Sequence, residues 1–156
     1  MCGKIFGFPH PVNEYAARVV AAMVVVLTAV IILADLPQLT GFLFYGFLAR
    51  VFTGPNLSPM GLLATRIIVP IFGNPIKAVP GPPKRFAQFV GLLFSGSAFV
   101  LGLESAAIVV LLVLAFFATL ESVVGFCTGC FVFNYLMRWG VIPQETCEKC
   151  NKLTFQ

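Results

Sequence analysis

Two long apolar segments constrain this chain more than any other feature. One runs from Ala16 to Ala34, and the other begins at Ser105 or Ala106 and continues through the apolar stretch 108–117. A helix of about 20 apolar residues crosses the hydrocarbon core of a membrane, and neither segment shows the polar face of a soluble helix. With 59% hydrophobic and 10% charged residues, the chain is more apolar than a soluble domain. The sequence therefore predicts an integral membrane protein.

Two further segments predict additional membrane helices. The segment Leu39–Phe52 is short and rich in Phe and Gly, and Phe86–Leu103 carries small residues that let helices pack closely in lipid. Between them, Met60–Val69 is too short to span the membrane and follows Ser58-Pro59, a pair typical of a helix start. We expect this short helix to lie at the membrane surface.

The remaining segments complete the fold prediction. Proline is frequent from Ile71 to Pro83, which predicts a loop. The helical pattern that begins at Ser105 continues to Trp139, so we expect one long helix that emerges from the bilayer. The predicted fold is all-α integral membrane, with four transmembrane helices plus a short interfacial helix between the second and third. Residues 1–139 form the predicted four-helix membrane domain, and residues 140–156 form a cytoplasmic tail.

The positive charges predict the orientation in the membrane. The connections after the first and third spans contain no Lys or Arg, only Asp35 and Glu104. All positive residues lie near the start of the first span, between the second and third, or after the fourth: Lys4, Arg18, Arg50, Arg66, Lys77, Lys84, Arg85, Arg138, Lys149 and Lys152. Because connections rich in Lys and Arg stay in the cytoplasm, we expect a bacterial inner-membrane protein with both termini cytoplasmic.

Four of the five cysteines form the most specific motif, which is two C-x-x-C pairs separated by sixteen residues: Cys127, Cys130, Cys147 and Cys150. The expected cytoplasmic side keeps thiols reduced. In a redox interpretation, one pair attacks a disulfide and the other relays the electrons. In a metal interpretation, all four thiolates bind zinc, for which this spacing is typical. A third interpretation, in which the cysteines are merely apolar filling, is the weakest of the three.

Few other residues are candidates for function. Glu121 is a carboxylate in an apolar span, so it either has a functional role inside the bundle or forms a hydrogen bond with a serine or arginine of a neighbouring span. Arg18, Arg50 and Arg66 are interpreted as anchors at the membrane interface. The single His argues against a His-based metal centre or a Ser-His-Asp hydrolase. No basic patch with interleaved aromatic residues indicates nucleic-acid binding.

Several sequence elements together resemble a bacterial membrane family described as domain of unknown function 4395. They cover nearly the whole chain, and the most specific is Phe126-Cys127-Thr-Gly-Cys130. The others are Asn13-Glu14 with Arg18, Gly46–Arg50, Ser58-Pro59, Pro80–Ala87 and Cys147-x-x-Cys150-Asn151. Relatives of this family are sometimes coupled to thioredoxin-like or rhodanese-like partners, so the resemblance implies thiol or sulfur exchange. A looser similarity links the chain to four-helix membrane oxidoreductases that use two cysteine pairs and a quinone.

The leading functional hypothesis is therefore thiol–disulfide or sulfur exchange with a partner protein through Cys127, Cys130, Cys147 and Cys150. The alternatives are a structural zinc site made by the same four cysteines and an accessory subunit of a larger membrane complex. Since a relay and a zinc site both need the sulfurs to meet, we expect the two pairs to approach each other at the cytoplasmic end of the last helix.

Overall fold

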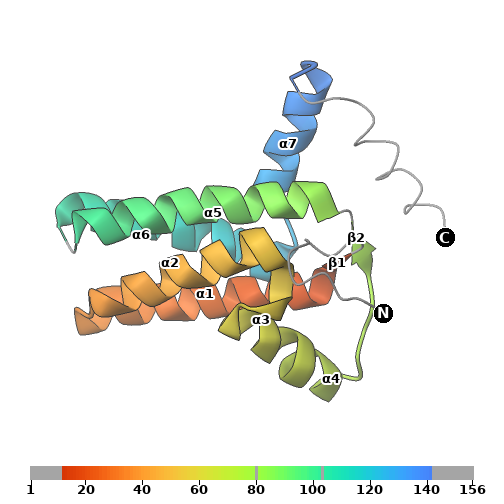
Figure 1. Ribbon diagram of the computed structural model, residues 1–156, viewed down its shortest axis with the longest axis horizontal. Coiled ribbons are helices and arrows are strands. Elements are labelled where there is room, and N and C mark those ends of the chain that lie inside the picture. Colours follow the sequence, from red (N-terminus) through yellow and green to blue (C-terminus); the bar gives the residue numbers. More distant parts are fainter. Residues whose placement is uncertain (1–11, 80, 103, 142–156) are drawn as a thin grey trace.

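The computed structural model describes residues 12–79, 81–102 and 104–141. Four helices lie side by side and alternate in direction (Figure 1), and each packs on the next to close a bundle: α1 (Glu14–Ala34), α2 (Gln38–Thr53), α5 (Gly81–Leu101) and α6 (Ser105–Thr119). The α1–α2 and α5–α6 turns lie at one end of this bundle, and α3, β1, β2 and α7 lie at the other. We call the second end the basic end, because the described Lys and Arg residues belong to the segments that gather there.

The bundle has a small apolar core and an apolar outer surface. Ile31, Leu43 and Leu111 are fully buried between the helices. On the outside, Leu33 and Val100 are 86% and 84% exposed. Among the described residues, two helices, Glu14–Ala34 and Ser105–Val124, are long and apolar enough to cross a membrane. The structure thus confirms a mostly helical chain with two candidate membrane spans, whereas α2 and α5 do not meet the same criterion.

The short helix between α2 and α5 forms where the sequence predicts it. It runs from Pro59 to Ile71 as α3 (Pro59–Leu63), a π-helical turn η2 (Ala64–Ile68) and α4 (Val69–Ile71). Ser58 caps its start, because its side chain accepts a hydrogen bond from the Gly61 amide. It leaves the bundle at the basic end (Figure 1).

The proline-rich segment is more structured than predicted. The helix α5 already begins at Gly81, so Pro82 and Pro83 lie in its first turn, where amides have no partner within the helix. Just before it, β2 (Ala78–Val79) pairs antiparallel with β1 (Val12–Asn13). The fold is thus mostly helical, as predicted, with one short strand pair that the sequence did not predict.

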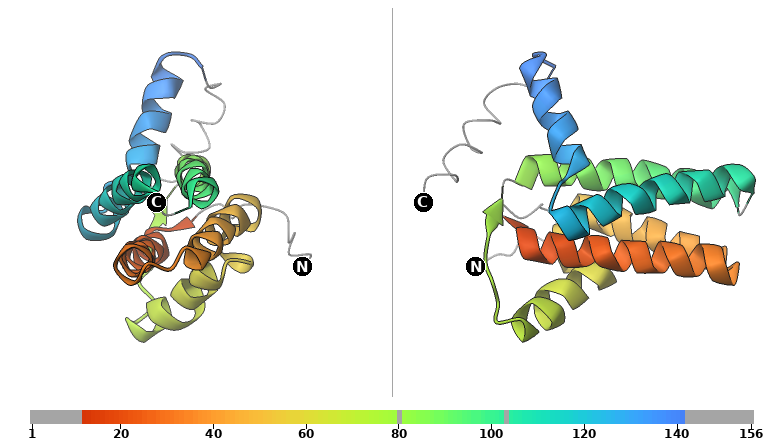
Figure 2. Two further views of the ribbon diagram at one scale, coloured as in Figure 1. Left: turned by 90° about the vertical axis from the view of Figure 1, so that its left-hand side faces the viewer. Right: turned by 180° about the vertical axis from the view of Figure 1, so that it is seen from behind.

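The prediction of one continuous last helix is also wrong. The helix α6 passes into a π-helical turn, η3 (Leu120–Val124), and ends at Gly125, whose φ of 75° is left-handed. A separate helix, α7 (Thr128–Arg138), then runs across the bundle axis (Figure 2). The first cysteine pair lies at this break, so its geometry differs from that of a pair on a regular helix.

Candidate functional site

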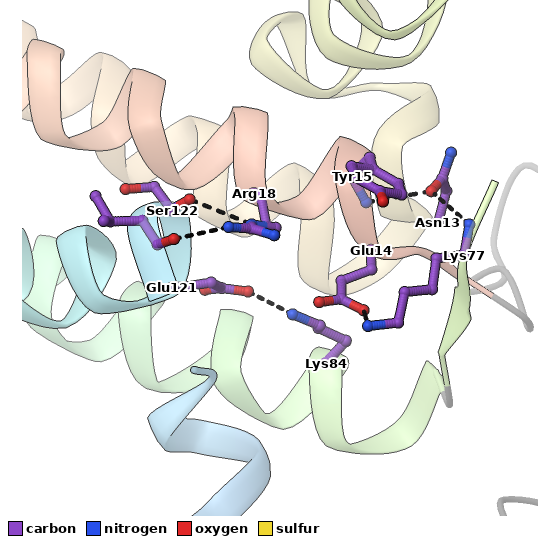
Figure 3. A network of polar contacts seen from close by, with 9 residues as sticks. Asn13, Glu14, Tyr15, Arg18, Lys77, Lys84, Glu121 and Ser122 are labelled. Carbon is purple, nitrogen blue, oxygen red and sulfur yellow. Dashed lines mark hydrogen bonds and ion pairs between the residues drawn. The ribbon is translucent and has the colours of Figure 1, made fainter. Parts of the chain in front are cut away.

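An arginine from the first helix, α1, stabilises the helix end between η3 and α7. Arg18 donates hydrogen bonds from Nε to the Ser122 carbonyl at 3.2 Å and from Nη2 to the Val123 carbonyl at 2.7 Å (Figure 3). These carbonyls belong to the last turn of the helix, where carbonyl groups lack helical partners. Arg18 thus stabilises the end of η3, and its interpretation as an interfacial anchor alone is incomplete.

The helix α7 begins at the first cysteine pair. Cys127 is its N-cap residue, and the Cys127 Sγ accepts a hydrogen bond from the Cys130 amide at 3.3 Å. Gly129 lies so close to α5 that a Cβ atom there would be 2.5 Å from the Cα of Ala87. Gly129 therefore has a packing role, since its missing side chain lets the start of α7 lie against α5.

The two thiols have different environments. Cys127 is 9% exposed and Cys130 is more exposed, and both are free thiols. The Cys130 thiol donates a hydrogen bond that lowers the pKa of Cys127; burial and the charge of Glu121 oppose this, and the charge of Lys84 reinforces it. The same hydrogen bond, together with burial, raises the pKa of Cys130. Cys127 is therefore the better nucleophile of the pair, because the thiolate is the reactive form.

Glu121 points into the bundle, as its sequence predicted, and its partner is a lysine. Lys84 Nζ and Glu121 Oε1 are 2.6 Å apart, with side chains only 7% and 15% exposed (Figure 3). This pair joins α5 to η3 beside the cysteines. The expected partner, a serine or an arginine, is thus replaced by Lys84, which also supplies positive potential to Cys127.

A cavity of about 300 Å³ lies between α1, α2, α5, α6 and α7. Its walls are mainly apolar, and its polar groups come from Arg50, Gln88, Glu121, Cys127 and Thr128. Arg50 is only 4% exposed, so its interpretation as an interfacial anchor is wrong. The burial of Arg50 could have been predicted from its position. Leu43, Phe47 and Arg50 have the spacing of one helix face, and Leu43 and Phe47 are buried in the core.

The predicted approach of the two cysteine pairs stays a prediction, because Cys147 and Cys150 lie outside the described residues. Within the described ranges, no group of three or more His, Cys, Asp or Glu side chains is arranged to hold a metal ion. The structure therefore brings together Cys127, Cys130, Lys84 and Glu121. The four-cysteine zinc site stays a prediction.

Comparisons with known proteins agree with the sequence motifs. The model of the family described as Domain of unknown function (DUF4395) matches residues 12–138. No curated protein and no solved structure matches the chain.

Proposed function

The chain belongs to the DUF4395 family, and we propose that it is a membrane-embedded thiol–disulfide exchange protein. The observation that carries this proposal is the asymmetry of Cys127 and Cys130 at the start of α7. Cys127 has the lowered pKa, accepts hydrogen bonds from the amide and thiol of Cys130, and faces a cavity, while Cys130 keeps its proton. An attacking thiolate and a resolving thiol need this difference.

The exchange proceeds in two balanced steps. The Cys127 thiolate attacks one sulfur of a partner disulfide, forms a mixed disulfide and releases the other sulfur as a thiolate. Cys130 then gives its proton to the partner thiolate released in the first step and attacks the Cys127 sulfur, which releases the second partner sulfur as a thiolate. The partner disulfide is reduced by two electrons and the Cys127–Cys130 pair is oxidised by two. A thioredoxin-like protein supplies such a disulfide, whereas a rhodanese-like partner would instead transfer a sulfur atom.

A trapping experiment tests these roles. Incubation of the Cys130→Ser chain with oxidised glutathione should accumulate a mixed disulfide on Cys127, because the resolving thiol is missing. The Cys127→Ser chain should form none at Cys130, whose pKa is raised. The measurement is site-resolved mass spectrometry. Equal modification of both variants would contradict the assigned roles, and stoichiometric zinc in the purified chain with no trapping would favour the structural metal site.

The same reaction has a defined pH dependence. In the Cys130→Ser chain the serine hydroxyl can replace the thiol as hydrogen-bond donor, so the pKa of Cys127 stays low. The rate should fall as pH decreases through that pKa and reach its plateau below the pH that an ordinary thiol needs. In the matched Cys130→Ala chain this donor is missing, so the midpoint should move to higher pH.

We also propose four membrane spans, α1, α2, α5 and α6, with the basic end in the bacterial cytoplasm. Support comes from the antiparallel bundle, its exposed apolar surface and the gathering of Lys and Arg at one end. The helix Pro59–Ile71, with exposed Ile67 and Ile71, then lies along the cytoplasmic membrane surface. An alkaline phosphatase fusion after Gln156 should be inactive and a cytoplasmic reporter active, and the opposite pattern would reverse the orientation.

A further inference from the structure

Arg50 is a buried cation whose charged group has no hydrogen-bond partner among the described residues. Its side chain is 4% exposed, and its Nε, Nη1 and Nη2 atoms are all buried and unpaired. The guanidinium lies over the ring of Phe47, 4.3 Å from the ring centre. Such a contact compensates only part of the hydration that a buried guanidinium loses, and arginine does not release its proton to avoid that loss.

The surroundings of Arg50 have an excess of positive charge. Arg50 lines the cavity of about 300 Å³ and also a second cavity of about 170 Å³. The charged residues in the walls of the two cavities are Arg50, Lys84 and Glu121. Because Lys84 and Glu121 neutralise each other at 2.6 Å, one positive charge remains while the Cys127 thiol, which lines the same cavity, carries its proton, and that charge belongs to Arg50.

Two further polar atoms in the first cavity also lack partners. The Gln88 amide oxygen and the Thr128 hydroxyl oxygen are buried without a hydrogen bond among the described residues. Thr128 can donate through its hydroxyl group, and Gln88 can donate through its amide nitrogen after a half-turn of the amide group. Three side chains, from α2, α5 and α7, thus offer donors to one cavity.

We propose that this cavity binds a small molecule carrying one negatively charged carboxylate or phosphate group, which accepts hydrogen bonds from the Arg50 guanidinium. The planar fork of a guanidinium matches the two oxygens of such a group. Arg50, Gln88 and Thr128 then gain partners, and the charge of the cavity is neutralised. The site is independent of the exchange reaction proposed above, since it requires no chemistry at sulfur.

Binding is measured with the full chain in zwitterionic lipid nanodiscs, in the Cys127→Ser background, which cannot carry out the exchange. Acetate and inorganic phosphate are titrated at constant ionic strength, with the shift of the unfolding temperature as readout. Arg50→Gln should weaken binding about ten- to hundredfold, the effect of a lost charge-assisted hydrogen bond. Arg66→Gln, which removes an exposed arginine from the nearby short helix, should leave binding unchanged. A parallel series in nanodiscs with phosphatidylglycerol, without added anion, separates a lipid headgroup from a soluble ligand.

A second readout uses the wild-type chain, so it does not depend on whether the Arg50→Gln chain folds. Cys127 lines the same cavity as Arg50, so in the wild-type chain anionic iodoacetate should alkylate Cys127 faster, relative to neutral iodoacetamide, than it alkylates free cysteine. Saturating acetate or phosphate should slow both reactions at Cys127. The proposal is overturned if no anion or anionic lipid raises the unfolding temperature and the alkylation ratio equals that of free cysteine, as expected for a guanidinium solvated by water alone.

Discussion

Replacing Lys84 with methionine is expected to lower the free energy of unfolding by about 3–5 kcal/mol, the typical effect of breaking a buried ion pair. The change leaves the Glu121 carboxylate, 15% exposed, without the ammonium that lies 2.6 Å away in the wild-type chain. Since the pair joins α5 to η3, its loss should also loosen the start of α7. Reversible unfolding in mixed micelles with a denaturing detergent measures the effect.

A second ion pair in the same chain provides the matched control. Lys77 Nζ lies 2.8 Å from Glu14 Oε2, but the Lys77 side chain is 63% exposed. Lys77→Met should therefore change the stability by only about 0–1 kcal/mol. The double replacement of Lys84 by methionine and Glu121 by leucine should recover most of the lost stability, because apolar side chains replace both charges. If the Lys84→Met chain were as stable as the Lys77→Met chain, the Lys84–Glu121 pair would not be a stabilising buried ion pair.

Gly129→Ala is expected to destabilise the chain by about 1–3 kcal/mol through overpacking, although alanine is the better helix former. The added Cβ would lie 2.5 Å from the Ala87 Cα, and backbone cannot turn aside as a flexible side chain can. The start of α7 must then move away from α5, so the amide of residue 130, which the Cys130→Ser chain retains, should lose its alignment with the Cys127 sulfur. A loss of mixed-disulfide trapping in the Cys130→Ser background should accompany the loss of stability.

Gly46→Ala is the matched control for this change. Gly46 is also helical and is buried, whereas Gly129 is partly buried, but a Cβ at Gly46 would meet only the Ser58 Oγ at 4.0 Å, an ordinary contact. The substitution should be neutral or stabilise the chain by up to about 1 kcal/mol. If Gly129→Ala were equally neutral, close packing of α7 on α5 would not explain the glycine between the cysteines.

Local sequence patterns located the four bundle helices and the short helix, and they placed the ends of α1 and α2 to within two residues, but they did not separate α7 from α6. Apolar runs and helix signals are local, so Ala16–Ala34 predicted α1 closely and Ser58-Pro59 predicted the start of the short helix. The motif around Cys127 and Cys130 was also sufficient to indicate the family. These features depend on residues close together in the chain, where propensity and periodicity act.

The contacts between polar residues depend on how distant segments of the chain pack. Lys84 and Glu121 are 37 positions apart, and Arg18 is more than 100 positions from the carbonyls of η3 that it binds. A single glycine does not by itself end a helix. The helix ends at Gly125 because Arg18 donates hydrogen bonds to carbonyl groups that would otherwise need helical partners. The partners of Arg18 and Lys84 come from other helical segments, because a polar group in an apolar bundle must find its partner wherever packing places one.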